Sequence, residues 1–134
     1  MRLTAIAVAT LAVIGLAGWL LWPSPPAAAT VSGGTSRYVV NATIDPPRMG
    51  DAEVTIDLTG RARSAQVATV SVEAVMPLMG FATPALPAAT TSKSGHYLVS
   101  GVPLMMTGPW ELRVSIAEEG GGTDDLTLPF TVSG

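Results

Sequence analysis

The chain has 134 residues, which is enough for one ordinary domain and a targeting segment but too few for two domains. Ten acidic residues against seven basic ones give a net charge of −3, which argues against nucleic acids and anionic lipid headgroups as partners. The chain has no cysteine, so disulfide bonds, zinc–thiolate sites and thiol nucleophiles are excluded.

The first predicted element is an apolar run over residues 3–22, which contains no charged residue. As a helix this run would span about 30 Å, the thickness of the hydrocarbon core of a bilayer. Arg2 precedes it, so we expect the N-terminus in the cytoplasm and the rest of the chain exported. The length favours an uncleaved membrane anchor over residues 1–22, followed by a Pro, Ala and Gly-rich linker over residues 23–36. The alternative is a cleaved signal peptide, because Ala27-Ala28-Ala29 satisfies the small-x-small rule.

From residue 37 onward, apolar and polar residues alternate with a period of two, which predicts β-strands with one buried face. No stretch has the period of an amphipathic helix. The apolar residues fall into six runs: Tyr38, Val40, Ala42 and Ile44; Val54, Ile56 and Leu58; Val70, Val72 and Ala74; Tyr97 and Val99; Trp110, Leu112, Val114 and Ile116; and Leu126, Leu128, Phe130 and Val132.

Turn-forming residues separate these runs, as at Asp45-Pro46-Pro47, Ser94-Gly95 and Gly120-Gly121-Gly122. Six or seven short strands in about 100 residues predict an all-β, immunoglobulin-like β-sandwich over residues 37–134. A small barrel is the alternative. Trp110 is the expected central aromatic residue of the core.

The segment from Met76 to Ser94 interrupts the alternation and contains three prolines. It predicts a long loop with a short edge strand near Phe81. Loops longer than about 12–15 residues are uncommon and often functional, so this loop and its neighbours are where we expect a site.

Three motifs follow one another along the sequence: Val75-Met76-Pro77-Leu78-Met79-Gly80, Ser94-Gly95-His96-Tyr97, and Val102-Pro103-Leu104-Met105-Met106-Thr107-Gly108-Pro109-Trp110-Glu111-Leu112. Together with Asp45-Pro46-Pro47-Arg48-Met49-Gly50, they resemble the YtkA-like domain family over most of residues 37–118. The resemblance implies an immunoglobulin-like sandwich that faces the periplasm or the cell exterior, is often membrane-anchored, and has no established catalytic activity. The related FixH-like proteins accompany assembly of copper-containing oxidases, and other relatives accompany heavy-metal efflux systems. The implied partner is therefore a membrane protein or a metalloprotein.

Methionines are the candidate ligands, because thioether sulfur is soft and favours Cu(I) over harder ions. If the Met76–Met79 turn lies beside Met105 and Met106, two or three sulfurs and the imidazole of His96 would converge on one ion. The alternative is packing, since methionine fills cores and two consecutive residues of a regular strand face opposite ways. Some relatives have histidine near the Met-Pro turn, but this chain does not. The candidate metal site consists of Met76, Met79, His96, Met105 and Met106, and Met49 is the remaining methionine of this region.

No catalytic constellation is present, so we expect that the chain is not an enzyme: its single histidine, His96, lies outside any motif that seats a catalytic serine. Glu118-Glu119 and Asp124-Asp125 flank the triple glycine and predict a solvated hairpin tip, with a calcium site as the alternative.

Two functional hypotheses follow. The first is a membrane-tethered, extracytoplasmic accessory domain that binds or delivers copper, or assists a metal efflux or oxidase assembly system. The second is a metal-free module that docks a membrane-protein partner through exposed apolar residues such as Leu78, Phe81 and Leu86.

Overall fold

A computed structural model describes Gly15, Gly18 and residues 27–62 and 64–134 of the protein. Apart from those two glycines, the anchor predicted for residues 1–22 lies outside the described residues. Within the described part of the chain, no helix is long and apolar enough to cross a membrane.

The described residues form ten β-strands and one short 3₁₀-helix, η1. Seven of the strands have six or more residues, and six of these lie within residues 37–134, where six or seven were expected; the other three strands have two residues each. In chain order the elements are β1 (Ala29–Gly34), β2 (Tyr38–Asp45), β3 (Gly50–Gly60), β4 (Val67–Met76), η1 (Pro77–Met79), β5 (Phe81–Ala82), β6 (Leu86–Pro87), β7 (Ala89–Thr90), β8 (His96–Leu104), β9 (Gly108–Glu118) and β10 (Thr123–Val132).

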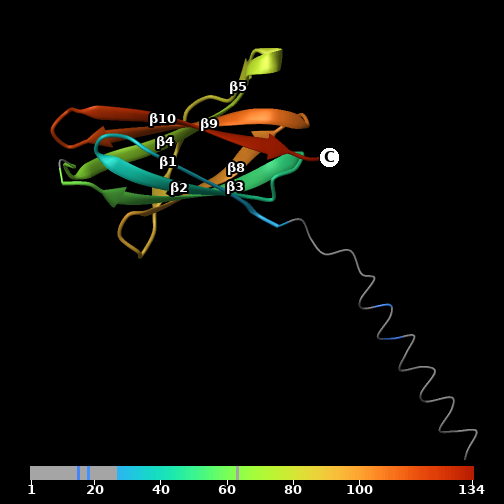
Figure 1. The fold of residues 1–134 in the computed structure, drawn as a ribbon, viewed down its shortest axis with the longest axis horizontal. Helices are drawn as coiled ribbons and strands as arrows, with labels where there is room; N and C mark the ends of the chain where they lie inside the picture. Colours follow the sequence, from blue (N-terminus) through green and yellow to red (C-terminus); the bar gives the residue numbers. More distant parts are fainter. Residues whose placement is uncertain (1–14, 16–17, 19–26, 63) are drawn as a thin grey trace, which may run out of the picture.

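The strands form two antiparallel sheets that lie face to face (Figure 1). The first sheet has the order β1-β2-β3-β8-β7, and the second has the order β10-β9-β4-β5, with β6 also paired to β4. The described strands thus divide into two separate sheets. This confirms the predicted all-β sandwich and makes the alternative of a single closed barrel wrong.

The core lies between the sheets and follows the alternation of the sequence. Trp110 of β9 is 1% exposed, as predicted, and its ring meets Phe81 edge-on with ring centres 5.9 Å apart. Full burial of each aliphatic core residue contributes about 1.5–3 kcal/mol. With no disulfide available, this packing holds the domain together. Besides Trp110, the fully buried large side chains are Tyr38, Val40, Ile44, Val54, Ile56, Val70, Val72, Val102, Leu104, Leu112 and Ile116.

The linker predicted over residues 23–36 is wrong for its second half, because residues 29–34 form β1. This strand pairs with β2 from Ala29 opposite Ile44 to Gly34 opposite Val39. Val31 packs against the core, and Gly33 lets the strand approach β10, since a Cβ at this glycine would lie 2.7 Å from Leu128. The predicted linker is thereby shortened to residues 23–28, of which 23–26 lie outside the described residues.

The segment predicted as a long loop contains short elements that cross from one sheet to the other. β5, the edge strand expected near Phe81, and β6 pair with β4, whereas β7 pairs with β8 of the first sheet. Thr83 is buried, and the Ala74 backbone N–H donates to its Oγ1 at 3.0 Å. The Thr83 N–H in turn donates to the Ala74 carbonyl at 3.0 Å. These bonds fix the segment against β4.

The sandwich has two ends, which carry different side chains. The methionine end holds the starts of β1, β3 and β9 and the ends of β4 and β8, with Met49, Met76, Met79, Met105 and Met106. The C-terminus lies at this end too, where Met49 N–H donates to the Ser133 carbonyl at 3.1 Å (Figure 1). The arginine end holds the starts of β2 and β8 and the turn between β9 and β10, and it is named after Arg37.

Candidate functional site

Two exposed methionines flank the last residue pair of the β3–β8 ladder. That pair is Gly50 opposite Leu104, and Met49 and Met105 are the next residues of the two chain segments. Leu104 is 1% exposed and its side chain faces the core. Because successive side chains of a strand alternate between its two faces, we expect the side chain of the next residue to face the solvent. Met49 is 52% exposed and Met105 is 60% exposed. The ladder therefore presents two thioether side chains from neighbouring strands to the solvent.

Met76 and Met106 belong to the packing of this end. Met76 is 4% exposed, and its Cε lies 3.1 Å from the position that a Cβ would occupy at Gly108. Gly108 also has a φ of +122°, which L side chains rarely adopt, so the backbone conformation there favours glycine. Met106 is half-buried, packs against the core, and accepts a hydrogen bond at its carbonyl from Trp110 Nε1 at 2.9 Å. This bond fixes the backbone beside Met105.

Met79 lies on η1, apart from the other exposed methionines. η1 begins at Pro77 and ends at Met79, and it is capped by Gly80, which has a left-handed φ of 62° and whose N–H donates to the Pro77 carbonyl at 3.2 Å. Figure 1 shows the segment that joins β4 to β5 projecting beyond the layer of β9 and β10, on the side away from β3 and β8. Met79 is 64% exposed there, so it does not share one site with Met49 and Met105.

A shallow apolar cleft of about 160 Å³ lies beside η1. Leu78, which is 76% exposed, and Trp110, which is 1% exposed, both line it. This cleft offers an apolar contact surface without a titratable cluster. Its lining consists of Pro77, Leu78, Pro109, Trp110, Glu111 and Pro129.

The structure does not bring His96 to the methionines, so its predicted convergence with them is wrong. His96 begins β8, and Leu104 ends it, which separates the two residues by about 26 Å along an extended strand. The histidine lies at the arginine end, with Nε2 3.9 Å from an Asp57 carboxylate oxygen and Nδ1 3.0 Å from Thr91 Oγ1. Sequence spacing could not show this, because a nine-residue strand lies between the two motifs.

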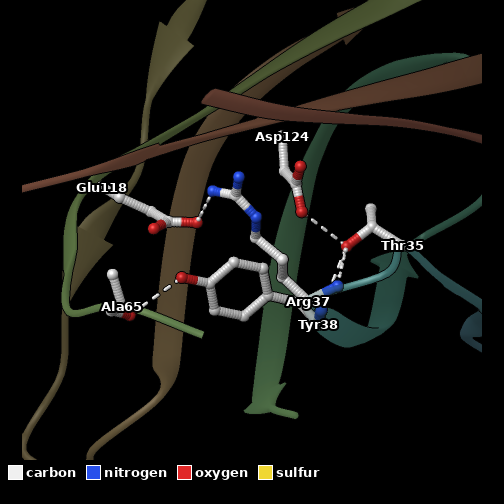
Figure 2. Close-up of polar contacts among 6 residues, drawn as sticks. All are labelled: Thr35, Arg37, Tyr38, Ala65, Glu118 and Asp124. Atoms are coloured by element: carbon white, nitrogen blue, oxygen red, sulfur yellow. Dashed lines mark hydrogen bonds and ion pairs between the residues drawn. The ribbon is translucent and has the colours of Figure 1, made fainter. Parts of the chain in front are cut away.

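The arginine end contains a polar network instead of a solvated hairpin tip (Figure 2). Glu118 is only 7% exposed, and its Oε1 accepts a hydrogen bond from Arg37 Nη1 at 2.7 Å. Thr35 Oγ1 donates to Asp124 at 2.6 Å and accepts from the Arg37 and Tyr38 N–H groups. The hydrogen bond and the charge of Glu118 raise the pKa of Arg37 above its ordinary value. The predicted tip is therefore wrong for Glu118, which closes the end of the sandwich.

Tyr38 lies beside this network with its ring in the core. Its hydroxyl donates to the Ala65 carbonyl at 2.9 Å (Figure 2). Burial raises the pKa of Tyr38 above the ordinary value, and the charge of Glu118 adds to the effect. A second cleft, of about 330 Å³, opens next to it. The lining is mostly small and polar: Tyr38, Leu58, Gly60, Ser64, Ala65, Gln66, Val67, Ser94, Gly95 and Tyr97.

Among the residues that the structure describes, no group of three or more His, Cys, Asp or Glu side chains could hold a metal ion. The donors that fit a soft ion are the thioethers of the methionine end, of which Met49 and Met105 are both solvent-accessible and directly flank the last residue pair of the β3–β8 ladder. Reasoning from sequence left Met49 out of the site, although its position directly before a strand was visible. The sequence did not show that Met105 lies at the neighbouring strand end.

The fold is similar to those of several solved structures. A DUF4426 family protein from Pseudomonas aeruginosa is 12% identical with a TM-score of 0.56, over 75% of this chain and 94% of that chain. A copper-bound variant of FetP from uropathogenic Escherichia coli is 13% identical with a TM-score of 0.55, over 80% of this chain and 97% of that chain. The PmoD soluble domain from Methylocystis is 15% identical with a TM-score of 0.53, over 77% of this chain and 97% of that chain. At these identities the similarity shows a shared fold.

No protein-family model matches the chain, and no curated protein sequence does. The similarity to YtkA-like domains is therefore one of sequence motifs, and the solved structures agree with it at the level of the sandwich fold.

Proposed function

We propose that this protein is a non-enzymatic, extracytoplasmic accessory domain that takes up Cu(I) at its methionine end and passes it to a metalloprotein or membrane-protein partner. The observation that carries the proposal is the pair Met49 and Met105, two exposed thioethers at adjacent ends of β3 and β8. Both side chains lie outside the core, so their sulfur atoms are accessible to an ion in solution. The thioether sulfur is polarizable and suits a soft ion.

The donor set suits transient binding rather than storage. Thioethers are neutral, soft ligands that select Cu(I) and bind harder divalent ions poorly. Two exposed sulfurs leave coordination positions open for ligands from a partner. A copper ion held in this way can be transferred without unfolding the domain, since Met49 and Met105 lie outside the core.

The shared fold supports the proposal in general terms only. One of the similar structures is a copper-bound FetP variant, so this sandwich can carry copper in another protein. The residues proposed here are assigned on the chemistry and exposure of this chain. Within the earlier candidate set, Met105 is retained, Met106 positions the backbone next to it, and Met76 serves the core. Met79 lies on η1, apart from Met49 and Met105, and His96 lies at the arginine end.

A second function, that of a metal-free docking module, is favoured by a separate observation. Among the described residues, Leu78 on η1 is the most exposed large apolar one, and it lines the apolar cleft at Trp110. An exposed apolar projection of this kind is typical of protein contact sites. In that case the domain would bind its partner through η1, and the sulfur atoms would be dispensable.

Titration with Cu(I) against a competing chelator tests the proposal on residues 27–134, which include all ten strands. We expect stoichiometric binding that the double variant Met49→Leu/Met105→Leu weakens at least tenfold. Leucine preserves the apolar character and removes only the sulfur.

The matched control is Met76→Leu, which removes a buried thioether and should leave Cu(I) affinity unchanged. Equal binding by the wild type and the double variant would contradict the copper proposal. Partner binding that survives the double variant and is lost in Leu78→Asp would favour the docking module.

A further inference from the structure

We infer that the methionine end is the membrane-facing end of the domain and that its exposed apolar side chains rest against the uncharged surface of the bilayer that holds the N-terminal anchor. The inference rests on retention of the apolar run over residues 3–22 as an anchor. It does not require copper, and it concerns how the domain is oriented.

First, the position where the chain enters the sandwich determines which end of the domain lies near the anchor. β1 begins at Ala29, which pairs with Ile44, one residue before β2 ends at Asp45. Residues 46–49 then lead to the start of β3 at Gly50. The linker therefore joins the domain at the methionine end, beside the segment that carries Met49.

The second step is the length of the linker. Only residues 23–28 separate Trp22, the last residue of the apolar run, from β1. Seven Cα–Cα steps from Trp22 to Ala29 span at most about 25 Å. β9 has 11 residues and a length of about 36 Å, so it runs most of the way along the sandwich. The linker is thus too short for the arginine end to turn toward the membrane.

The third step is the surface that results. The exposed large hydrophobic residues of the described part of the chain are Met49, Leu78, Met79 and Met105, and all four lie at the methionine end. They come from three separate segments, so exposed apolar residues are spread over this end and are not confined to one loop. The surface of a bilayer is a partner that extends over all three segments at once.

The charges at this end indicate which lipids fit. Asp45 and Asp51 are exposed next to the methionines, whereas Arg48 supplies one positive charge. This balance disfavours an anionic lipid surface and favours lipids with no net charge. The arginine end, by contrast, uses its charges in internal contacts.

Depth-dependent quenching tests the orientation on the full chain in phosphatidylcholine vesicles. The sequence has no cysteine, so single-cysteine variants can each carry one fluorophore. Suitable exposed positions are Thr107 at the methionine end, Thr127 in the middle of β10 and Ser92 at the arginine end. Lipids with a spin label in the headgroup then quench each fluorophore according to its distance from the membrane.

We expect quenching to be severalfold stronger at Thr107→Cys than at Ser92→Cys, with Thr127→Cys between them. Equal quenching at the three positions, or none, would overturn the inference, and absence of quenching would also result if the anchor were cleaved or if only a protein partner covered this end. In either case the copper titration on residues 27–134 would be unaffected, so the two proposals fail separately.

A second variant tests whether the apolar side chains make the contact. Leu78→Asp should reduce quenching at Thr107→Cys by at least twofold, because a charged residue does not enter the interface. Ser100→Asp adds the same charge at an exposed position in the middle of β8 and should leave quenching unchanged. Equal quenching in both variants would overturn the proposed contact.

Discussion

The two ends of the sandwich differ in the chemistry of their side chains. At the arginine end, polar side chains bond to one another: Arg37 to Glu118 at 2.7 Å, Thr35 to Asp124 at 2.6 Å, and Tyr38 to the Ala65 carbonyl at 2.9 Å. At the methionine end, the large exposed side chains Met49, Leu78, Met79 and Met105 are apolar, and side chains donate to backbone carbonyls, as Trp110 Nε1 does to Met106 and Ser133 Oγ does to Pro47.

The difference shows that the residues that stabilise this small sandwich and the residues that are available for contacts lie at different ends. The arginine end links β2 to the β9–β10 hairpin, which lie in different sheets, so its bonds hold the two layers together. The methionine end leaves Met49, Leu78, Met79 and Met105 without such bonds. A surface that meets a metal, a membrane or a partner must remain available, and this one does.

The largest expected effect separates two methionines of the same end. Met76→Ala should lower the free energy of unfolding by about 2–5 kcal/mol, because the side chain is 4% exposed and its removal leaves a cavity. Met105→Ala should change it by no more than about 0.5 kcal/mol, since the side chain is 60% exposed. Urea denaturation of the two variants measures both values.

Similar losses in the two variants would contradict the division of this end into a packed part and an exposed part. Met76→Leu is the matched control, because it keeps the volume and should cost less than about 1.5 kcal/mol.

Much of the fold was predictable from the sequence because its strands are regular. The alternation through Trp110, Leu112 and Val114 fixes a buried face, and the structure buries all three. β1 was missed because an edge strand of small residues, Ala29 to Gly34, has the composition of a linker. Its pairing depends on contacts with β2 and β10, which lie far along the chain.

The candidate site was predictable in its chemistry but only partly in its geometry. The sequence indicated soft ligands, and Met105 is exposed as such a site requires. It could not show that Met49 and Met105 flank the pair of Gly50 and Leu104, or that the length of β8 separates His96 from Met105. Nor could it show that Glu118 pairs with Arg37, because the partners are 81 residues apart.

A smaller effect is expected from the ion pair of the arginine end. Glu118→Gln keeps the shape of the side chain but removes the charge that faces Arg37, so the melting temperature should fall by less than in Met76→Ala. Arg37 is partly exposed and water replaces some of the lost interaction, which limits the effect. Thermal unfolding by circular dichroism measures the change.

Glu119→Gln is the control for this variant, because Glu119 is exposed and next to Glu118. It should melt as the wild type does. If the two variants melt together, the Arg37–Glu118 pair adds nothing to stability, and the contrast between the two ends is lost.

The smallest expected effect is a pH dependence that originates at Tyr38. Burial raises the pKa of Tyr38 in the folded state above its ordinary value of about 10, so the folded protein holds the phenol proton more tightly than the unfolded chain. The contribution to stability is complete below about pH 10 and declines as the pH rises through the folded-state pKa. Denaturation in urea at several values between about pH 8 and pH 11 should show this decline.

Tyr38→Phe should remove this part of the decline. The same variant should cost about 1 kcal/mol at neutral pH, because it removes the hydrogen bond to the Ala65 carbonyl. Tyr97→Phe, which alters a half-buried tyrosine of β8, should keep the alkaline decline. An equally steep decline in Tyr38→Phe and the wild type would mean that the buried phenol is not its source, and the polar network would then hold the arginine end together without any contribution from the ionisation state of Tyr38.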